Sequence, residues 1–336
     1  MKRIIVSRTD SIGDVVLTLP ILGWLKSSFP SSDILFLGKS YTKPVVHLSE
    51  NVTEFIDWDK IRKLPPKEQV SAFRKLNADL IIHVFPVSEI AMLAKKAGIP
   101  ERLGTTNRLY HWTTCNMLVS LSRKNSSLHE AQLNLKLIKK LCQKREIPSL
   151  EAIPDLYGLK KPEPPQKKLA AMVDSERLNV IIHPKSKGSA REWGTDNFRA
   201  LINSLEEEKF NVFITGTESE GEILEKEGFF DFSRQVHNLL GKLSLEDLIS
   251  FISSSDALVA GSTGPLHIAA AYGIHAIGLY PPIKPMHPGR WAPVGKNALF
   301  LVKEKKCTDC RNTNICECLR SIPPEQVRLK LEQANE

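Results

Sequence analysis

An acidic residue near the N-terminus has the surroundings of a general base. Asp14 comes directly after Gly13, in a turn that follows a short β-branched run. Gly13 lets the backbone turn sharply out of the strand, and Asp14 then falls in the first turn of a helix, where the helix dipole favours a carboxylate. An ionised carboxylate at the mouth of a cleft can accept the proton of a substrate hydroxyl, as group transfer to an alcohol requires. The alternative is that Asp14, or Asp10 before it, only caps the helix.

A second candidate site is the loop of residues 183–193, which gathers two lysines, an arginine, two hydroxyls and a glycine. These groups suit a diphosphate: Arg191 offers two parallel donors, Lys187 a point charge, and Ser186 a further hydrogen bond. The alternative is an ordinary basic surface loop. We expect Trp193 to anchor the following helix and not to stack on a base.

A third candidate site is the turn of residues 260–271, where a strand passes into a helix. Ser262 or Thr263 can cap that helix, and Pro265 suits its first position. The remaining backbone N–H groups then form a binding site for an anion such as phosphate. His267, about one turn later, is placed either to touch a phosphate or ribose or to pack in the core.

Four thiols lie close together near the C-terminus. They are Cys307, Cys310, Cys316 and Cys318. Two close pairs can form a structural zinc site, but the second spacing is tighter than in zinc ribbons. Reduced thiols or a redox-sensitive turn are the alternative, since a cytoplasmic setting disfavours stable disulfides. No catalytic role is expected of them.

The elements that must position these groups alternate between strand and helix. In the first half, we expect strands at 2–7, 33–37 and 80–85, and helices at 12–25, 70–76, 89–97 and 129–143. In the second half, we expect strands at 178–182, 211–215, 256–260 and 276–280, and helices at 195–208, 218–227, 244–253 and 265–272. This alternation predicts an α/β fold with two doubly wound parallel sheets, whose carboxyl edges bind ligands.

The break between the two halves is rich in proline. Five prolines fall within residues 148–165, which predicts an interdomain linker there. We assign residues 1–155 to an N-terminal Rossmann-like domain and 156–168 to the linker. Residues 169–336 form a C-terminal Rossmann-like domain with the cysteine-rich tail and a final helix. The two sheets are expected to face a central cleft.

Composition and charge narrow the class of protein. A chain of 336 residues with 42% apolar and 25% charged residues is typical of a globular protein. We expect a cytoplasmic protein, because the N-terminus turns polar too early for a signal peptide and no apolar run could span a bilayer. Residues 1–150 hold 23 Lys and Arg against 13 Asp and Glu, whereas residues 151–336 hold 23 against 25. The basic first half, with a cluster at Lys60, Arg62, Lys63 and Lys67, favours an anionic partner or is merely solvated. Nucleic acid is not expected as a partner, since no recognised binding module occurs.

Taken in order, these segments resemble glycosyltransferase family 9, the bacterial lipopolysaccharide heptosyltransferases. Residues 10–20 are similar to the family's opening motif, residues 182–193 to its central phosphate loop, and residues 262–271 to its C-terminal signature. The cysteine-rich tail that ends at residues 321–327 also resembles that of family members. The resemblance covers nearly the whole chain, and three motifs in order are more specific than one.

The resemblance implies a GT-B fold in which the first domain binds the acceptor and the second binds the nucleotide sugar. It implies an inverting, metal-independent transfer of a heptose or related sugar from an ADP-sugar to a lipopolysaccharide core acceptor. No cofactor is implied beyond the ADP-sugar donor, and peripheral contact with the inner face of the inner membrane is expected. Carried over by position, Asp14 is the general base, and Arg191 stabilises the departing diphosphate. The substrate-binding residues are expected to be Gly13, Ser186, Lys187, Ser262, Thr263, Gly264 and His267.

One position departs from the family pattern. Many family members carry an aspartate just before the Thr-Gly of the last motif, where it contacts the donor sugar, and this chain has Ser262. A shorter, neutral group there bears on the donor sugar and on the activity level, and it favours one alternative, a sugar-nucleotide-binding protein with weak catalysis. A separate alternative is another GT-B enzyme acting on a nucleotide sugar, such as an epimerase-like enzyme.

Overall fold

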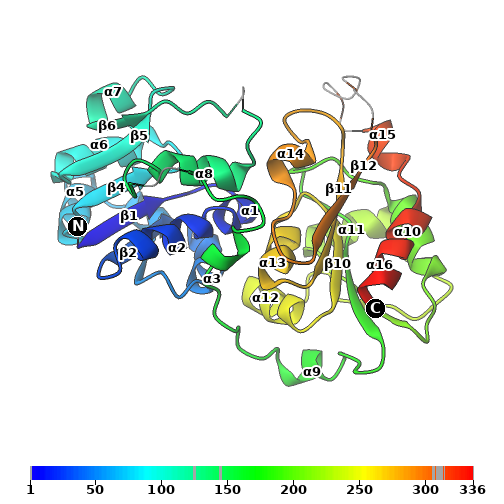
Figure 1. Ribbon diagram of the computed structural model, residues 1–336. Coiled ribbons are helices and arrows are strands. Elements are labelled where there is room, and N and C mark those ends of the chain that lie inside the picture. The colour runs from blue at the N-terminus through cyan, green and yellow to red at the C-terminus, as the bar shows by residue number, and fades with distance from the viewer. Residues whose placement is uncertain are drawn as a thin grey trace. The chain divides into compact units, whose positions relative to one another are not determined.

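The computed structural model describes residues 2–123, 126–143, 146–304, 307, 313 and 315–335. The chain divides into two compact units, Met1–Lys160 and Lys161–Glu336, shown in Figure 1. Each unit has its own parallel sheet, so each is described by itself. No helix in the described ranges combines the length and apolar character needed to cross a bilayer.

The first unit is built on a parallel sheet of six strands in the order β3-β2-β1-β4-β5-β6. The strands are β1 (Arg3–Ser7), β2 (Asp33–Gly38), β3 (Glu54–Asp57), β4 (Leu80–His83), β5 (Glu101–Thr105) and β6 (Met117–Val119). Strand order reverses between β1 and β4, which pair with Ile4 opposite Leu80 and Ser7 opposite His83. In open α/β sheets such a reversal leaves a crevice at the carboxyl edge, where ligands bind.

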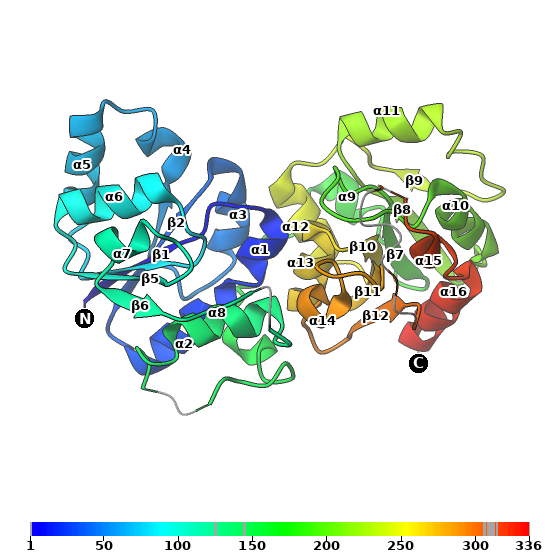
Figure 2. The same cartoon turned by 90° about the horizontal axis from the view of Figure 1, so that it is seen from above.

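Helices cover both faces of this sheet because its central strands are apolar on both sides. They are α1 (Ile12–Val16), α2 (Leu19–Ser28), α3 (Lys43–His47), α4 (Trp58–Ile61), α5 (Pro66–Lys75), α6 (Ser88–Ala97), α7 (His111–Thr114) and α8 (Glu130–Ile138), with 3₁₀ turns η1 (Ser40–Thr42) and η2 (Pro154–Leu156). Figure 2 shows α5 and α6 on one side of the sheet and α2 and α8 on the other. Ile4, Ile5 and Val6 of β1 are fully buried between these layers.

The helix expected at residues 12–25 is broken into α1 and α2. Pro20 lies in the first turn of α2 and has no N–H to continue the hydrogen bonds of α1. The Thr18 hydroxyl donates to the Asp14 carbonyl at 2.8 Å. The break leaves α1 as a separate turn that presents Asp14 at the end of β1.

Residues 153–160, which the proline content placed in or beside a linker, pack on the first unit. Ile153 and Tyr157 are buried, and the Lys160 amide donates to the Leu48 carbonyl at 2.7 Å. A Cβ added to Gly23 of α2 would lie 2.2 Å from the Leu156 carbonyl oxygen, so α2 touches this segment directly. Prolines are compatible with this packing because the segment has no long helix or strand whose backbone hydrogen bonds they would interrupt.

The second unit repeats the same strand order, β12-β11-β10-β7-β8-β9. The strands are β7 (Leu178–His183), β8 (Phe210–Ile214), β9 (His237–Asn238), β10 (Ala257–Gly261), β11 (His275–Tyr280) and β12 (Ala298–Val302). All the pairs are parallel, and the order reverses between β7 and β10. The loops that follow β7 and β10 therefore meet at the carboxyl edge.

The helices of the second unit again form two layers. They are α9 (Lys167–Ala170), α10 (Thr195–Ser204), α11 (Glu218–Lys226), α12 (Leu245–Ser253), α13 (Gly264–Tyr272), α14 (Pro288–Trp291), α15 (Glu317–Arg320) and α16 (Pro324–Glu332), followed by the 3₁₀ turn η4 (Gln333–Asn335). Figure 2 shows α12 and α13 on one side of the sheet and α10 and α16 on the other. The buried Trp193 packs edge-on against Phe198 of α10, and its indole N–H donates to the Ile322 carbonyl at 2.9 Å. Trp193 thus anchors α10 and the C-terminal segment, as expected.

Candidate active site

The carboxyl end of β1 carries a cluster of charged side chains around Arg8. Arg8 directly follows β1, and its side chain is only 3% exposed. Its Nε donates to Asp10 Oδ1 at 2.6 Å, and its Nη2 donates to Asp14 Oδ1. Its Nη1 lies 3.5 Å from Glu130 Oε1. One buried guanidinium is therefore shared by three carboxylates.

Asp14 is held by both of its oxygens. Oδ1 accepts from Arg8 and Oδ2 accepts from the Ser11 hydroxyl. The Asp14 side chain is 17% exposed, so it is reachable from solvent although fixed by its neighbours. Gly13, just before it, is buried within α1. These contacts fix the orientation of the Asp14 carboxylate before any ligand binds.

Asp10 differs electrostatically from a surface carboxylate. Burial raises the pKa of Asp10 to about 6, and Asp14 adds to the rise, while Arg8 opposes it. For Arg8, burial lowers the pKa, but Asp10, Asp14 and Glu130 outweigh burial and raise it above its ordinary value. Arg8 is therefore always charged, and Asp10 titrates near neutral pH.

A second layer from α8 supports this cluster, and the sequence analysis did not find it. Glu130 is 1% exposed and also binds Arg123 Nε at 2.9 Å. Asn134 accepts from Arg8 at 3.4 Å and from Arg123 at 3.2 Å, and donates to the Leu17 carbonyl at 3.0 Å. Glu130 and Asn134 are four residues apart and so share one face of α8. The four-residue spacing of Glu130 and Asn134 was the available signal.

In the second unit, several polar side chains of the loop after β7 bind other protein groups. The buried Lys185 amine binds Glu192 at 3.2 Å and Glu227 at 2.9 Å. The Ser186 hydroxyl donates to the Ala190 carbonyl at 3.0 Å. These two residues brace the loop, and the segment has two further cations.

Those remaining cations are Lys187 and Arg191. Lys187 is exposed and has a φ of +49°, in the left-handed region. The Arg191 backbone carbonyl lies against Gly261 at the end of β10, since a Cβ there would sit 3.4 Å from it. The structure thus brings the loop that contains Arg191 together with the turn that begins α13.

The N-terminus of α13 lacks the side-chain cap that the sequence suggested. Thr263 is the N-cap residue, but its side chain makes no capping hydrogen bond, and Gly264 is the first helical residue. Thr263 is 6% exposed, and its Oγ1 has no hydrogen-bond partner within the described ranges. Burial raises the pKa of Tyr280, and Ser262 counters part of that rise, so Ser262 lies near the Tyr280 hydroxyl. His267 is 3% exposed inside the unit.

An uncapped helix N-terminus beside an unpartnered hydroxyl can hold an anion. The first N–H groups of a helix have no intrahelical acceptor and carry the positive end of its dipole. Because α13 has nine residues, that dipole is well developed. Thr263 Oγ1 adds a donor at the same place, so the turn offers a phosphate several hydrogen bonds.

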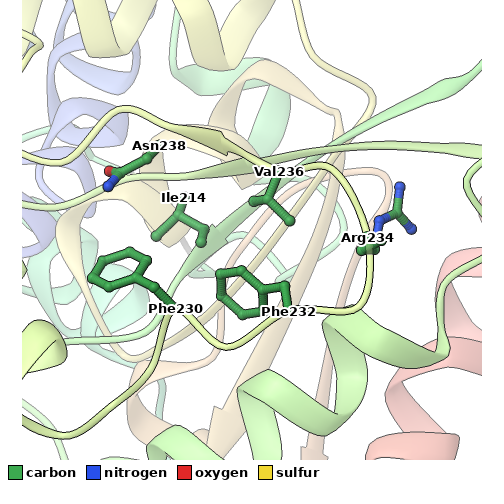
Figure 3. Close-up of a pocket in the computed structure, with 6 residues that line it drawn as sticks. All are labelled: Ile214, Phe230, Phe232, Arg234, Val236 and Asn238. Carbon is green, nitrogen blue, oxygen red and sulfur yellow. The ribbon is translucent and has the colours of Figure 1, made fainter.

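A cavity of about 230 Å³ lies elsewhere in the second unit, shown in Figure 3. It is lined by Ile214, Phe230, Phe232, Arg234, Val236 and Asn238. Arg234 donates to the Leu205 carbonyl and to the Phe210 carbonyl, at the start of β8. None of the candidate site residues lines this cavity.

The cysteine-rich segment is only partly described. Cys316 is buried and Cys307 and Cys318 are half-buried, while Cys310 lies outside the described residues. In the part of the chain that the structure covers, no three His, Cys, Asp or Glu side chains are grouped as metal ligands. The structural-zinc hypothesis therefore stays a prediction.

Each unit therefore has a parallel sheet of the same strand order with polar loops at its switch point, the architecture of the two halves of a GT-B fold. The family model for glycosyltransferase family 9 (heptosyltransferase) matches residues 70–319. The chain therefore belongs to glycosyltransferase family 9 and is a glycosyltransferase.

Individual relatives agree with this assignment. Lipopolysaccharide heptosyltransferase 3 of Escherichia coli is 22% identical over 288 residues, covering 80% of this chain and 79% of its own. A family 9 glycosyltransferase from Veillonella parvula superposes with a TM-score of 0.75 at 18% identity, covering 99% of this chain and 97% of its own. The E. coli heptosyltransferase WaaC, solved with ADP, has a TM-score of 0.70 at 20% identity, with 99% of each chain covered. These two solved structures establish the likeness in fold.

Proposed function

We propose that this protein is an inverting, metal-independent heptosyltransferase that moves a heptose from ADP-heptose to a lipopolysaccharide core acceptor. Membership in family 9 supports the class of reaction. The donor is supported by WaaC, which has been solved with ADP and with ADP-2-deoxy-2-fluoro heptose. The acceptor is supported by the lipopolysaccharide heptosyltransferase among the relatives.

The observation that carries the donor proposal is the start of α13. Thr263 Oγ1 is buried without a partner among the described residues, and it stands at the uncapped end of that helix. A buried hydroxyl without a partner is unfavourable, and a phosphate oxygen of the donor would satisfy it. Gly264 supplies a backbone N–H at the same end. Arg191, in the adjoining loop, would neutralise charge on the departing diphosphate.

The proposed base is Asp14. It takes the proton of the acceptor hydroxyl as that oxygen bonds to the anomeric carbon and the bond from this carbon to the diphosphate breaks. Attack from the face opposite the diphosphate inverts the anomeric centre. Arg8 and Ser11 hold the carboxylate in one orientation, which reduces the ordering needed in the transition state. Lys187, Ser186, Gly13 and His267 remain helpers in substrate binding.

The acceptor is expected to be anionic. Residues 1–150 carry a net charge of +10, counted from 23 basic and 13 acidic residues. Lys60 of α4 is 84% exposed in its side chain, and Arg62, Lys63 and Lys67 are exposed on the following turn and the start of α5. A phosphorylated core oligosaccharide has the charge that this surface would attract.

Ser262 bears on donor specificity. Ser262 is shorter than an aspartate and carries no charge. We propose that the contact to the donor sugar is weaker here, so a related ADP-sugar is an alternative donor. A cytoplasmic location, peripheral to the inner face of the inner membrane, suits this donor and acceptor.

The test is an assay of ADP-heptose against core oligosaccharide acceptors, with product analysis by mass spectrometry. Asp14→Asn should lower turnover by at least about a hundredfold and leave ADP binding within twofold, because general base catalysis contributes about that much. Asp10→Asn is the matched control, since Asp10 shares Arg8 but is not the proposed base. Thr263→Val should instead weaken ADP binding.

Three results would contradict the proposal. Full transfer by Asp14→Asn would remove the base assignment, and loss of transfer in Asp10→Asn alone would move it to Asp10. Consumption of the donor without any acceptor would point to a different nucleotide-sugar reaction.

A further inference from the structure

The connection between β5 and β6 carries large apolar side chains that face solvent. Leu109 is 88% exposed and Trp112 of α7 is 60% exposed. Met92 of α6, a helix that packs against α7, is 45% exposed. Single exposed apolar residues are common on soluble proteins, but a leucine and a tryptophan three residues apart are not explained by packing within this unit.

Trp112 is fixed in its exposed position. Its indole Nε1 donates to the Thr106 carbonyl at 3.0 Å, so its polar edge is already satisfied by the protein. The indole N–H therefore needs no hydrogen bond from water when the ring leaves the solvent. Little side-chain entropy remains to be lost when its exposed face is covered.

Cationic side chains occur next to Leu109 in the sequence and on α6, which packs against α7. Arg108 is exposed next to Leu109, and Lys95 Nζ of α6 donates to the Thr113 carbonyl at 2.7 Å, which places Lys95 beside α7. Lys96 is also exposed, and Glu89, one turn before Met92, adds a single negative charge. These four charged groups sum to +2.

We propose that Leu109, Trp112 and the cations Lys95, Lys96 and Arg108 form a docking surface for a bilayer that contains anionic phospholipids. Tryptophan is enriched at the level of lipid headgroups, leucine inserts among acyl chains, and each nearby Lys or Arg gains from anionic lipid. A protein partner fits less well, because stable protein interfaces bury about 800 Å² per partner and two or three side chains present much less.

The position of this surface suits a lipid-linked acceptor. The loop of residues 106–110 leaves the carboxyl end of β5, at the same edge of the sheet as Asp14. Strand β5 is two strands from β1 in the order β1-β4-β5, so the two strand ends are separated by about 10 Å. The inference thus extends the proposed function, but lipid binding needs neither donor nor acceptor and can be tested without them.

The experiment measures co-sedimentation of the full-length protein with two kinds of vesicle, phosphatidylcholine alone and phosphatidylcholine mixed with phosphatidylglycerol. The parent should bind the mixed vesicles more strongly. Leu109→Ser combined with Trp112→Ser should lower the bound fraction at least about tenfold, since two apolar side chains no longer leave water. Leu109→Ser alone should give a smaller loss, and thermal unfolding checks that both variants fold.

Charge and location have their own controls. Lys95→Gln, Lys96→Gln and Arg108→Gln together should remove the preference for phosphatidylglycerol. Ile223→Ser is the matched apolar control, because Ile223 is 46% exposed on α11 of the second unit. It should leave vesicle binding unchanged.

Three outcomes would overturn the inference. The parent fails to bind mixed vesicles, Ile223→Ser weakens binding as much as the double variant does, or Leu109→Ser dissolves an oligomer seen by gel filtration. The last result would mean that a second copy covers this surface. Transfer to a soluble acceptor should stay within twofold of the parent in the double variant, so the docking surface and the proposed reaction can fail separately.

Discussion

The buried Arg8 gives the sharpest test of how the first unit is stabilised. We expect Arg8→Met to destabilise this unit by about 3 to 5 kcal/mol, because it removes one partner of a buried ion cluster and leaves carboxylates uncompensated. Asp10 and Asp14 contribute most to this cost, because they lose the guanidinium that binds them at short distance, whereas Glu130, although only 1% exposed, keeps Arg123 at 2.9 Å. Loss of the contact between Arg8 and the Phe85 ring, 5.9 Å apart, adds a smaller amount.

The destabilisation should depend on pH. Burial already raises the pKa of Asp10 to about 6 with Arg8 in place, and without Arg8 it should rise further. A carboxyl whose pKa is higher in the folded than in the unfolded state destabilises the fold above that pKa, and the penalty disappears as pH falls toward the unfolded value. The difference in free energy of unfolding between Arg8→Met and the parent should therefore become smaller from pH 7 to pH 5.

Hydrogen exchange followed by mass spectrometry on peptides of β1 and α8 confines the measurement to this unit. Arg123→Met is the matched control, because its guanidinium binds the same Glu130 but is 23% exposed, and it should cost about 1 kcal/mol. A loss below 1 kcal/mol for Arg8→Met, or a loss that does not change with pH, would refute the reasoning.

Two further predictions concern stability alone. Burial lowers the pKa of His83 to about 3, so unfolding takes up a proton below about pH 6.5, and this group costs about 2 kcal/mol of stability at pH 5. Denaturant titrations should show that the free energy of unfolding falls less with decreasing pH in His83→Phe than in the parent. An unchanged pH dependence would contradict this role of His83. Gly23→Ala should lower the melting temperature although alanine favours a helix by about 1 kcal/mol, because the new Cβ would lie 2.2 Å from the Leu156 carbonyl oxygen. Gly221→Ala in α11, where the nearest contact is 3.3 Å, is the control, and equal melting temperatures for the two variants would contradict the clash.

The sequence predicted the α/β class and the strands that lie at the centre of each sheet. β1, β4, β7, β8, β10 and β11 are apolar runs buried on both faces, which is the pattern that parallel strands show. The strands it missed lie toward the sheet edges: β3, β5, β6, β9 and β12. Strands β3, β6 and β9 have four, three and two residues, so their pattern resembles that of loops. Strand β12 is an apolar run of five residues, and the sequence analysis overlooked it.

The sequence also overextended some helices. The helix expected at 129–143 ends at Ile138, and that expected at 195–208 ends at Ser204. In both cases the predicted helix continues into a segment rich in charged residues. A segment that buries no apolar face has little to keep it helical.

For the site, the sequence located the three loops but not the partners of their side chains. Lys185 was grouped with the phosphate-binding cations, yet it is bound to Glu227, forty-two residues away. Arg8 was not considered, although Asp10 and Asp14 are close to it in sequence; its burial against Glu130, more than a hundred residues later, was the part that local spacing could not show. Pairing over such distances is set by the fold and cannot be predicted from local spacing.

The loop after β1 in the first unit and the loops after β7 and β10 in the second unit differ in which polar groups lack a protein partner, and this difference suggests distinct roles. In the first unit, Arg8 and Ser11 already occupy the oxygens of Asp14, so the charged groups are ordered before any ligand arrives. In the second unit, the Lys185 amine is already bound to Glu227, while Thr263 Oγ1 has no hydrogen-bond partner in the described part of the chain. Such an unpartnered hydroxyl costs about 1 to 3 kcal/mol and is retained where a ligand supplies the missing bond. A preordered carboxylate suits a group that acts on a proton, and an open donor set suits one that holds a diphosphate, which is the division of labour that sugar transfer needs.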